Sequence, residues 1–398
     1  MKSVSFIIPS YNNLQHLKNA YNSIKKHAPN AEVILLDDGS TDGTWEWIYE
    51  LAESHQHREV KCYKSDERVG HTILYDKGIE MATQEIVGIL HADMIIGPNY
   101  VENMIKHLQP GKVVCATRIE PPLHPEGKEK IIKDFGLDFD TLNIPAFEEY
   151  CILSQLENKD KTTKGMFAPW ILYKSDFQAI GGHDPLFAPF PYEDSDIFQR
   201  WILAGYELIQ SRDSFVYHLT CRGHRWNEKV GVDDAYYKMV SQKAARNYLR
   251  KWGSWIKNDE YQYPIIPHKY GVGLVVNNCN LELLRALEPW CDKIYIEDGY
   301  GMITTNYIDE EQKNTKFDLS RRIRLINHHD PICENDIVVE FDGTMLNQNN
   351  FIFIERLSEI LTENEISVGY YEMDIFKFHI SSVRHYENDL IKIANNYA

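Results

Sequence analysis

Three carboxylates stand within four positions of the segment 189–201, namely Glu193, Asp194 and Asp196. Neighbouring carboxylates repel one another and resist burial, so the pKa of one of them should rise unless a cation or a donor lies nearby. A carboxylate with a raised pKa can take up a proton near neutral pH, as a general base must. The segment therefore predicts acid–base chemistry.

Two further acidic segments lie upstream, each directly after a short apolar run. Asp38 closes the run 33–36, and Asp93 follows the run 86–90. Ligands of α/β sheets bind at the carboxyl ends of the strands, so these acids are expected at one edge of a sheet. Carboxylate oxygens suit hard divalent cations, which also bind phosphates. The three segments together predict a site for a metal ion and a phosphorylated ligand.

The elements that must position these acids alternate between short apolar strands and amphipathic helices. Such alternation predicts a mostly parallel sheet with right-handed crossovers, flanked by helices. Residues 127–160 are polar and weakly patterned, which indicates an insertion. We expect strands over 4–8, 33–36, 60–63, 86–90, 112–116, 167–173 and 213–218, and helices over 14–24, 45–52, 72–82, 98–108, 197–204 and 235–252.

A second, smaller α/β domain is predicted after the linker 263–267. Strands are expected over 272–276, 293–296, 336–341 and 366–370. Asp298 and Asp342 follow two of them as Asp38 and Asp93 follow theirs. We hypothesise that this domain is a degenerate copy of the nucleotide-binding half. The alternative is an unrelated domain in which strand–Asp–Gly turns recur because the turn chemistry recurs. A different strand order would contradict the copy.

Composition excludes several classes of protein. A chain of 398 residues with 43% hydrophobic and 25% charged residues is expected to form two globular domains. A net charge of -17 argues against nucleic acid as a partner. Seven scattered cysteines without a C-x-x-C pair indicate reduced thiols. Without a signal peptide or a membrane-spanning stretch, we expect a cytoplasmic protein that visits a membrane surface if its acceptor lies there.

Five motifs, in order and at consistent spacing, carry a resemblance to a known family over about residues 1–225. The chain resembles an inverting family 2 glycosyltransferase of the GT-A fold. The motifs are Val4-Ser-Phe-Ile-Ile-Pro-Ser-Tyr-Asn12, Asp37-Asp-Gly-Ser-Thr-Asp42, His91-Ala-Asp93, Gly181-Gly182 with Phe187, and Glu193-Asp194-x-Asp196 followed by Arg200 and Gly205. The resemblance implies a domain over 1–260, divided into a nucleotide-sugar half (1–120) and an acceptor half (121–260). The C-terminal domain, 268–398, carries none of these motifs.

The resemblance implies a role for each matching residue on the donor side. Pro9 and Tyr11 match the loop that lies against the nucleotide base, and Asp38 matches the acid that binds the base edge. Ala92 and Asp93 match the end of the metal-binding D-x-D signature. The implied cofactor is Mn²⁺ or Mg²⁺, which neutralises the leaving diphosphate.

The resemblance also implies roles around the acceptor. Asp194 matches the base that deprotonates the acceptor hydroxyl, and Glu193 and Asp196 would orient this base or a nearby loop. His218 stands where related folds place a further metal ligand. The implied partners are a nucleotide-sugar donor and a glycan, lipid-linked or protein acceptor, with homo-oligomers left open.

The chain departs from the family pattern at three places. His91 replaces the first Asp of D-x-D, so metal contact is expected from Asp93 and water alone. Residues 74–78 replace the usual Arg-Asn-x-Gly, so Arg68 or Lys77 is expected to contact the diphosphate instead. The Gln-x-x-Arg-Trp of processive enzymes is absent, which predicts transfer of a single sugar.

Each of these residues also has a structural interpretation. Asp38 could cap a turn, Asp93 could be a solvated acid at a strand end, and His218 could be a core histidine. The acids at 193–196 could form a charge cluster favoured by a helix N-terminus. The metal-dependent transferase, with a UDP-sugar favoured, is therefore weighed against a non-catalytic nucleotide- or glycan-binding protein. A sugar-phosphate nucleotidyltransferase is a third alternative, but the loop after the first strand lacks the glycines that bind a triphosphate.

Overall fold

The computed structural model describes residues 3–54, 59–220, 226–227, 232–233, 235–299, 301–326 and 334–393. The chain forms two compact units, the first from residues 1–241 with 258–265 and the second from residues 242–257 with 266–398. The division crosses the chain after residue 241, inside helix α8 (Ala235–Trp252), again after residue 257, and finally after residue 265, inside the predicted linker 263–267.

Strand β1 (Val4–Ser10) is buried along its whole length at the centre of the first unit. It pairs in parallel with β2 (Glu32–Asp37) on one side and β4 (Ile86–Ile89) on the other. Strand β3 (Val60–Lys64) pairs in parallel with β2. Strands covered on both faces read as continuous apolar runs, which is why the sequence predicts them well. The order β3-β2-β1-β4 places the ends of β1, β2 and β4 at one edge.

The sheet continues beyond β4 with antiparallel pairs. Its order in the described residues is β3-β2-β1-β4-β9-β6-β10-β5, with β7 beside β6 and β8 beside β10. Strand β9 runs antiparallel to both of its neighbours, β4 and β6. The further strands are β5 (Met94–Ile96), β6 (Lys112–Glu120), β7 (Lys130–Ile132), β8 (Thr162–Lys164), β9 (Trp170–Tyr173) and β10 (Glu207–His218), and β11 (Trp226–Asn227) pairs with β12 (Val232–Asp233).

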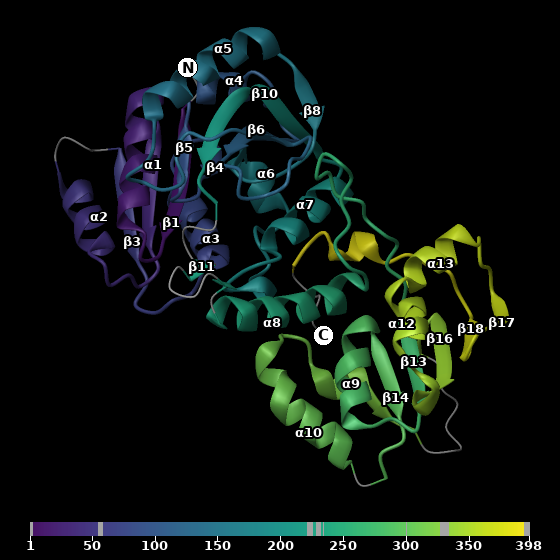
Figure 1. The fold of residues 1–398 in the computed structure, drawn as a ribbon. Coiled ribbons are helices and arrows are strands. Elements are labelled where there is room, and N and C mark those ends of the chain that lie inside the picture. Colours follow the sequence, from purple (N-terminus) through teal and green to yellow (C-terminus); the bar gives the residue numbers. More distant parts are fainter. Residues whose placement is uncertain are drawn as a thin grey trace. The chain divides into compact units, whose positions relative to one another are not determined.

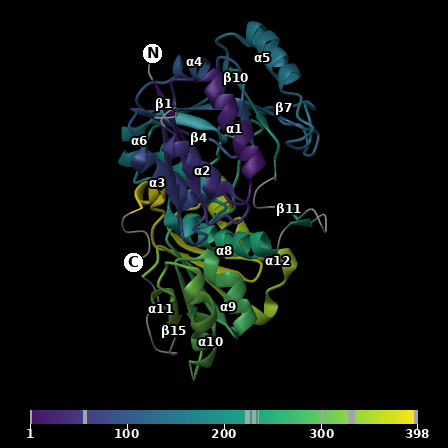
Figure 2. The ribbon, with the colours of Figure 1, turned by 90° about the vertical axis from the view of Figure 1, so that its left-hand side faces the viewer.

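Helices flank this sheet (Figures 1 and 2), so the α/β prediction is confirmed. The predicted insertion contains an ordered helix, α5, whose Phe147 and Cys151 pack against Phe215 and Tyr217 of β10. The helices are α1 (Leu14–His27), α2 (Thr44–Glu53), α3 (His71–Met81), α4 (Tyr100–Ile105), α5 (Ile144–Asn158), α6 (Lys174–Ala179) and α7 (Glu193–Leu203), with a 3-10 turn at Pro185–Phe187.

The second unit also contains a sheet with helices beside it (Figure 2). Its strands are β13 (Val272–Asn277), β14 (Lys293–Ile296), β15 (Ile323–Leu325), β16 (Ile337–Asp342), β17 (Gly369–Met373) and β18 (Phe376–Ile380). Its helices are α9 (Leu281–Leu287), α10 (Met302–Glu311), α11 (Leu319–Arg322), α12 (Gln348–Glu355) and α13 (Leu357–Glu363), with 3-10 turns at Glu288–Trp290, Gln312–Asn314, Gly343–Met345 and Glu387–Leu390.

The two sheets share a strand order, as the copy hypothesis requires. The order β15-β14-β13-β16 repeats β3-β2-β1-β4, and all of these pairs are parallel. In both sheets the next strand, β18 or β9, is antiparallel. The acids at the strand ends of the second unit are nevertheless bound by nearby groups. Asp342 accepts hydrogen bonds from Thr344 and Asn278, and Asp298 accepts one from the Thr304 amide. In the second unit these carboxylates stabilise turns.

Two expectations from composition can be compared with the described residues. All five cysteines in them are free thiols. In the same part of the chain, the helices are too short or too polar to cross a bilayer.

A buried ion cluster in the second unit centres on Glu288, which is inaccessible to solvent. Its carboxylate accepts hydrogen bonds from Arg250 of α8 (2.8 Å), from Arg322 (2.6 Å) and from the Tyr307 hydroxyl (2.7 Å). Burial alone would raise the pKa of Glu288, but the two guanidinium groups hold it well below its usual value. The cluster explains why the C-terminal part of α8 belongs to the second unit.

We predict that Glu288→Ala lowers the free energy of unfolding by about 3–5 kcal/mol, because it leaves Arg250 and Arg322 buried without their carboxylate. Urea denaturation followed by circular dichroism measures this loss. The control is Glu310→Ala, which removes an exposed pair with Arg285 and should cost about 1 kcal/mol or less. Equal losses in the two variants would contradict the prediction.

Candidate active site

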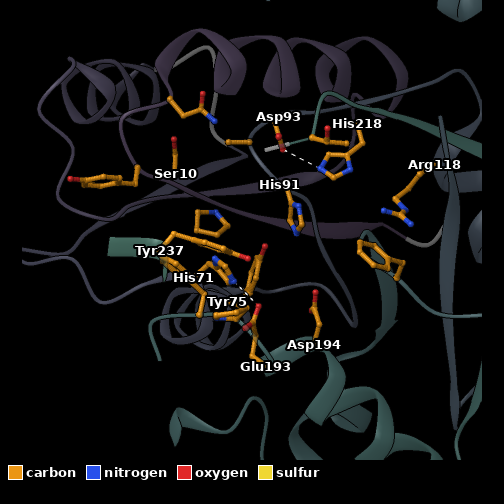
Figure 3. A pocket seen from close by; sticks show the side chains of 18 of the residues that line it. Ser10, His71, Tyr75, His91, Asp93, Arg118, Glu193, Asp194, His218 and Tyr237 are labelled. Carbon is orange, nitrogen blue, oxygen red and sulfur yellow. Dashed lines mark hydrogen bonds and ion pairs between the residues drawn. The ribbon is translucent and has the colours of Figure 1, made fainter. Parts of the chain in front are cut away.

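A cavity of about 460 Å³ opens at the carboxyl ends of the strands of the first unit (Figure 3). This volume lies within the range of about 300–1,000 Å³ that small-molecule sites occupy. The cavity brings together every site residue that the sequence predicted. They are Pro9, Tyr11, Asp38, Arg68, Ala92, Asp93, Glu193, Asp194 and His218. Their individual roles remain predictions.

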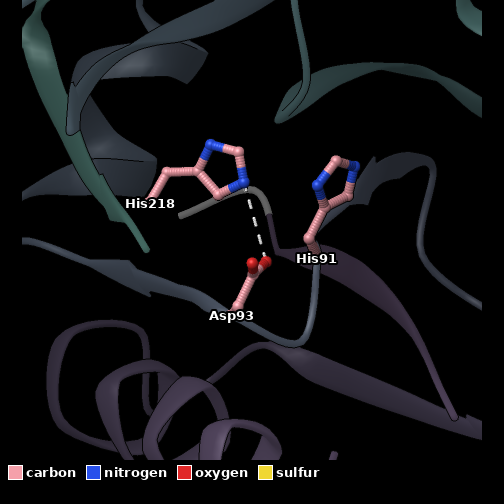
Figure 4. Close-up of side chains that lie close together, drawn as sticks. All are labelled: His91, Asp93 and His218. Atoms are coloured by element: carbon pink, nitrogen blue, oxygen red, sulfur yellow. Dashed lines mark ion pairs between the residues drawn. The ribbon is translucent and has the colours of Figure 1, made fainter. Parts of the chain in front are cut away.

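Three side chains form a cluster that could hold a metal ion (Figure 4): His91, Asp93 and His218. One ligand atom of each lies within 4.8 Å of the others, and His218 Nε2 is 3.7 Å from Asp93 Oδ1. The sequence interpretation left metal contact to Asp93 and water. The sequence also named His218 as a further ligand, and the structure adds His91 to the same cluster. Which of these side chains contacts an ion remains a prediction.

The sheet sets this cluster through the antiparallel pairing of β5 with β10. Met94 of β5 lies opposite His218 of β10, and the Leu219 amide donates to the Asp93 carbonyl (3.1 Å). Two imidazoles and one carboxylate fit a divalent transition ion such as Mn²⁺ better than Mg²⁺, which prefers oxygen ligands throughout. The donor set therefore fits the expected cofactor.

His218 also contacts Glu120, a residue outside the motifs that the sequence singled out. Glu120 ends β6, and its Oε1 lies 3.2 Å from His218 Nδ1. Arg118 and Lys130 donate to the same carboxylate at 2.7 and 3.0 Å. Burial opposes ionisation of Glu120, but hydrogen bonding to His218 and the charge of Arg118 lower its pKa to about 2. Glu120 is therefore a permanent anion beside the cluster.

Across the cavity, helix α7 begins with the acidic pair Glu193 and Asp194 (Figure 3). His71 of α3 contacts Glu193 through Nε2 and Oε1 at 2.6 Å and stacks on Phe190. Burial would raise the pKa of Glu193, but the charge of His71 holds it below its usual value. No sequence pattern pointed to His71, because it lies 122 residues from its partner.

The pKa of Asp194 is shifted in the opposite direction to that of Glu193. Burial, and then the charge of Glu193, raise the pKa of Asp194 to about 7. Its Oδ1 is buried and accepts no hydrogen bond among the described residues. The sequence predicted that the pKa of one carboxylate in the segment 193–196 would be raised, and Asp194 is the residue whose surroundings raise it. This carboxylate can exchange a proton with a group in the cavity near neutral pH.

Asp38 holds the loop that precedes α3. Its Oδ1 accepts the amides of Val69 (2.7 Å) and Gly70 (3.1 Å), while burial raises the pKa of its carboxyl group. Gly70 has φ of 84°, and a Cβ there would lie 2.2 Å from the Pro189 side chain. Asp38 therefore serves as a turn-stabilising residue and also faces the cavity, where its remaining lone pairs can accept a donor.

Arg68 lies over the Tyr11 ring at 4.0 Å and near the Tyr236 ring at 4.6 Å. Both Arg68 and Tyr11 line the cavity. The alternative cation, Lys77, pairs with Glu80 at 2.9 Å and is absent from the residues that line it. Of the two cations considered for a diphosphate, only Arg68 lies at the described cavity.

The third acid of the α7 segment has a structural role. Asp196 is inaccessible to solvent and accepts a hydrogen bond from Arg200 Nε at 2.7 Å. Arg200 also donates to the carbonyls of Ile180 (3.1 Å) and Gly182 (2.6 Å). The pair fixes the glycine loop below the cavity, as the sequence interpretation suggested for a nearby loop.

Comparison with known proteins shows which family the chain is similar to. Residues 5–167 match the model of glycosyl transferase family 2. The chain is 30% identical to the poly-beta-1,6-N-acetyl-D-glucosamine synthase of Staphylococcus epidermidis over 124 residues, which are 30% of this chain and 29% of the relative. It is 27% identical to the dolichol-phosphate mannosyltransferase of Pyrococcus furiosus over 28% of this chain and 32% of the relative. The match thus spans about a third of these relatives' length.

A solved structure is similar over a longer stretch. The crystal structure of GalNAc-T7 with UDP, GalNAc and Mn²⁺ aligns with a TM-score of 0.47 and 15% identity. The alignment covers 66% of this chain and 49% of that one.

We predict that Asp194→Asn stabilises the fold at alkaline pH. A carboxyl group whose pKa is raised in the folded state, here to about 7, costs stability once the pH exceeds its unfolded pKa of about 3.9. The cost grows up to the folded pKa, and the variant removes it. Thermal unfolding should show a gain of roughly 1–2 kcal/mol at pH 8 that disappears near pH 4. A pH-independent difference would contradict the raised pKa.

Proposed function

We propose, from the match of residues 5–167 to the model of glycosyl transferase family 2, that the protein belongs to this family and transfers a single sugar with inversion. The donor is a nucleoside-diphosphate sugar, with UDP favoured, and the acceptor is a hydroxyl group of a glycan, a lipid-linked sugar or a protein. One observation carries this proposal. The metal-ligand cluster and the high-pKa carboxylate Asp194 line the same cavity from different elements.

The nucleoside would lie against the loop after β1. Pro9 and Tyr11 offer an apolar and aromatic surface to the base, and Asp38 can accept a hydrogen bond from the base edge. The guanidinium of Arg68 lies over the Tyr11 ring, and its N–H groups can bind the diphosphate. These contacts would orient the donor and leave its sugar towards α7.

The residues that would hold a divalent ion are His91, Asp93 and His218. When bound, such an ion neutralises charge on the departing diphosphate. Ala92, between the two ligands of the β4–β5 turn, has no bulk that would obstruct the phosphates. The mixed nitrogen and oxygen donors make Mn²⁺ the better candidate.

The chemical step assigned to Asp194 is proton removal from the acceptor hydroxyl. The hydroxyl oxygen then attacks the anomeric carbon, and the bond from that carbon to the diphosphate oxygen breaks with its electron pair on the diphosphate. A single in-line displacement inverts the configuration. Glu193 remains ionised beside His71, and its negative charge helps to keep the pKa of Asp194 at about 7. In this proposal Glu193 stays negatively charged, while Asp194 accepts the proton.

The donor site is tested by thermal shift with UDP, GDP, CDP and dTDP and their sugars, with and without Mn²⁺. A ligand that binds only the folded state raises the melting temperature by mass action. We expect a shift with one nucleotide that depends on Mn²⁺. His91→Ala should weaken that dependence, since it removes one of three protein ligands. No shift with any nucleotide would favour the non-catalytic alternative, and pyrophosphate release from a nucleoside triphosphate would favour the nucleotidyltransferase.

The base assignment predicts that Asp194→Asn abolishes transfer, with a loss of at least about a hundredfold, while donor affinity stays nearly unchanged. In the wild type, the rate should rise with pH through about 7, because the base must be deprotonated. Release of the nucleoside diphosphate over a panel of acceptors measures both effects. Asp196→Asn is unsuitable as a control because Asp196 is buried in an ion pair. Full activity of Asp194→Asn would refute the assignment.

A further inference from the structure

We propose that Glu120 is a positioning residue that fixes the ring of His218 so that Nε2, and not Nδ1, faces the ion. This inference rests on the proposed function, because it requires the ion that His91, Asp93 and His218 would hold. It extends that function to a residue outside the ligand cluster, on a different strand.

The contacts of His218 point in two directions. Its Nδ1 lies 3.2 Å from Glu120 Oε1, and its Nε2 lies 3.7 Å from Asp93 Oδ1. A neutral imidazole carries one N–H and one lone pair, so a ligand histidine must expose the lone pair to the ion. The hydrogen bond made by the other nitrogen decides which one is exposed. An anion at Nδ1 holds the proton there and leaves Nε2 as the donor atom.

Register and buried charge hold Glu120 in this position. Strands β6 and β10 run in parallel with Ile119 opposite Tyr217, which makes Glu120 and His218 neighbours at the ends of the two strands. The Glu120 carboxylate is 1% exposed and is fixed by Arg118 on one oxygen and Lys130 on the other. Arg118 in turn lies 3.5 Å over the Phe167 ring. A carboxylate that is fixed in this way can orient a ring without moving itself.

The chain supplies a matched control in Glu129. It is also buried, and its Oε1 contacts the opposite guanidinium nitrogen of Arg118 at 3.4 Å. The hydrogen bonds and ion pairs described for its side chain involve Arg118 and not His218. Glu120→Gln and Glu129→Gln each remove one negative charge from Arg118 within the same cavity wall. Only Glu120→Gln replaces the anionic acceptor at His218 Nδ1.

The test is a Mn²⁺ titration of the folded, full-length protein by isothermal calorimetry or by electron paramagnetic resonance of free Mn²⁺. We expect Glu120→Gln to raise the Kd for Mn²⁺ by roughly 10–100-fold, the usual effect of losing an outer-shell partner. Glu129→Gln should change it by no more than about threefold, as expected for a charge without a hydrogen bond to the ligand. Equal losses in both variants would overturn the inference but not the metal site. No Mn²⁺ binding by the wild type would overturn the metal site as well.

A second measurement needs no variant and therefore does not depend on correct folding of Glu120→Gln. Nitrogen NMR of the metal-free wild type with labelled histidine, recorded over a pH series, reports which ring nitrogen of His218 carries the proton in the neutral ring. We expect the proton on Nδ1. A proton on Nε2, towards Asp93, would overturn the inference, because a merely structural Glu120 would not determine the tautomer.

Discussion

Six carboxylates among the described residues line one cavity of the first unit, and keeping them there without mutual repulsion is the constraint on which the site depends. Each buried acid needs its own counter-group, because unpaired charges are costly away from water. Glu120 has Arg118 and Lys130, Glu193 has His71, and Asp38 has the amides that precede α3. Asp194 faces the cavity with a raised pKa. Burial, and then the charge of Glu193, allow this one carboxylate to exchange a proton near neutral pH.

The pairing of the strands holds the charged side chains at fixed positions. Strand β10 lies between β5 and β6, so its last residue, His218, meets Asp93 on one side and Glu120 on the other. A shift of one residue in either pairing would turn alternate side chains to the other face of the sheet and dismantle the cluster. The opposite wall depends on the close approach of Gly70 to Pro189, which carries α3 and His71 to the start of α7. Two separate packing contacts therefore place the candidate metal cluster and Asp194 in one cavity.

The second unit shows that the strand order alone does not make such a site. Its strands repeat the order of the first four strands, and acids again stand at their ends. There, Asp298 and Asp342 are engaged by the amides and side chains of the turns that follow. The candidate metal group of the second unit in the described residues, His268, His385 and Glu387, lies outside these strand ends. Strand-end acids that accept hydrogen bonds from turns are found in both units. The acids and their positively charged partners that line the described cavity belong to the first unit.

The sequence alone determined the elements whose signal is local. Apolar runs predicted β1 to β4, and Asp38 and Asp93 were identified because they directly follow two such runs. The acids at 193–196 were identified by their close spacing. Tertiary structure decided what depends on distant partners. It made α5 part of the core and joined His91 to the candidate metal cluster. It also lowered the pKa of Glu193 through His71 and raised the pKa of Asp194 through burial and the charge of Glu193. The contacts of His71 with Glu193 and of Glu120 with His218 link residues 122 and 98 positions apart, a separation at which only the packing of the sheet and helices defines the environment of a charge.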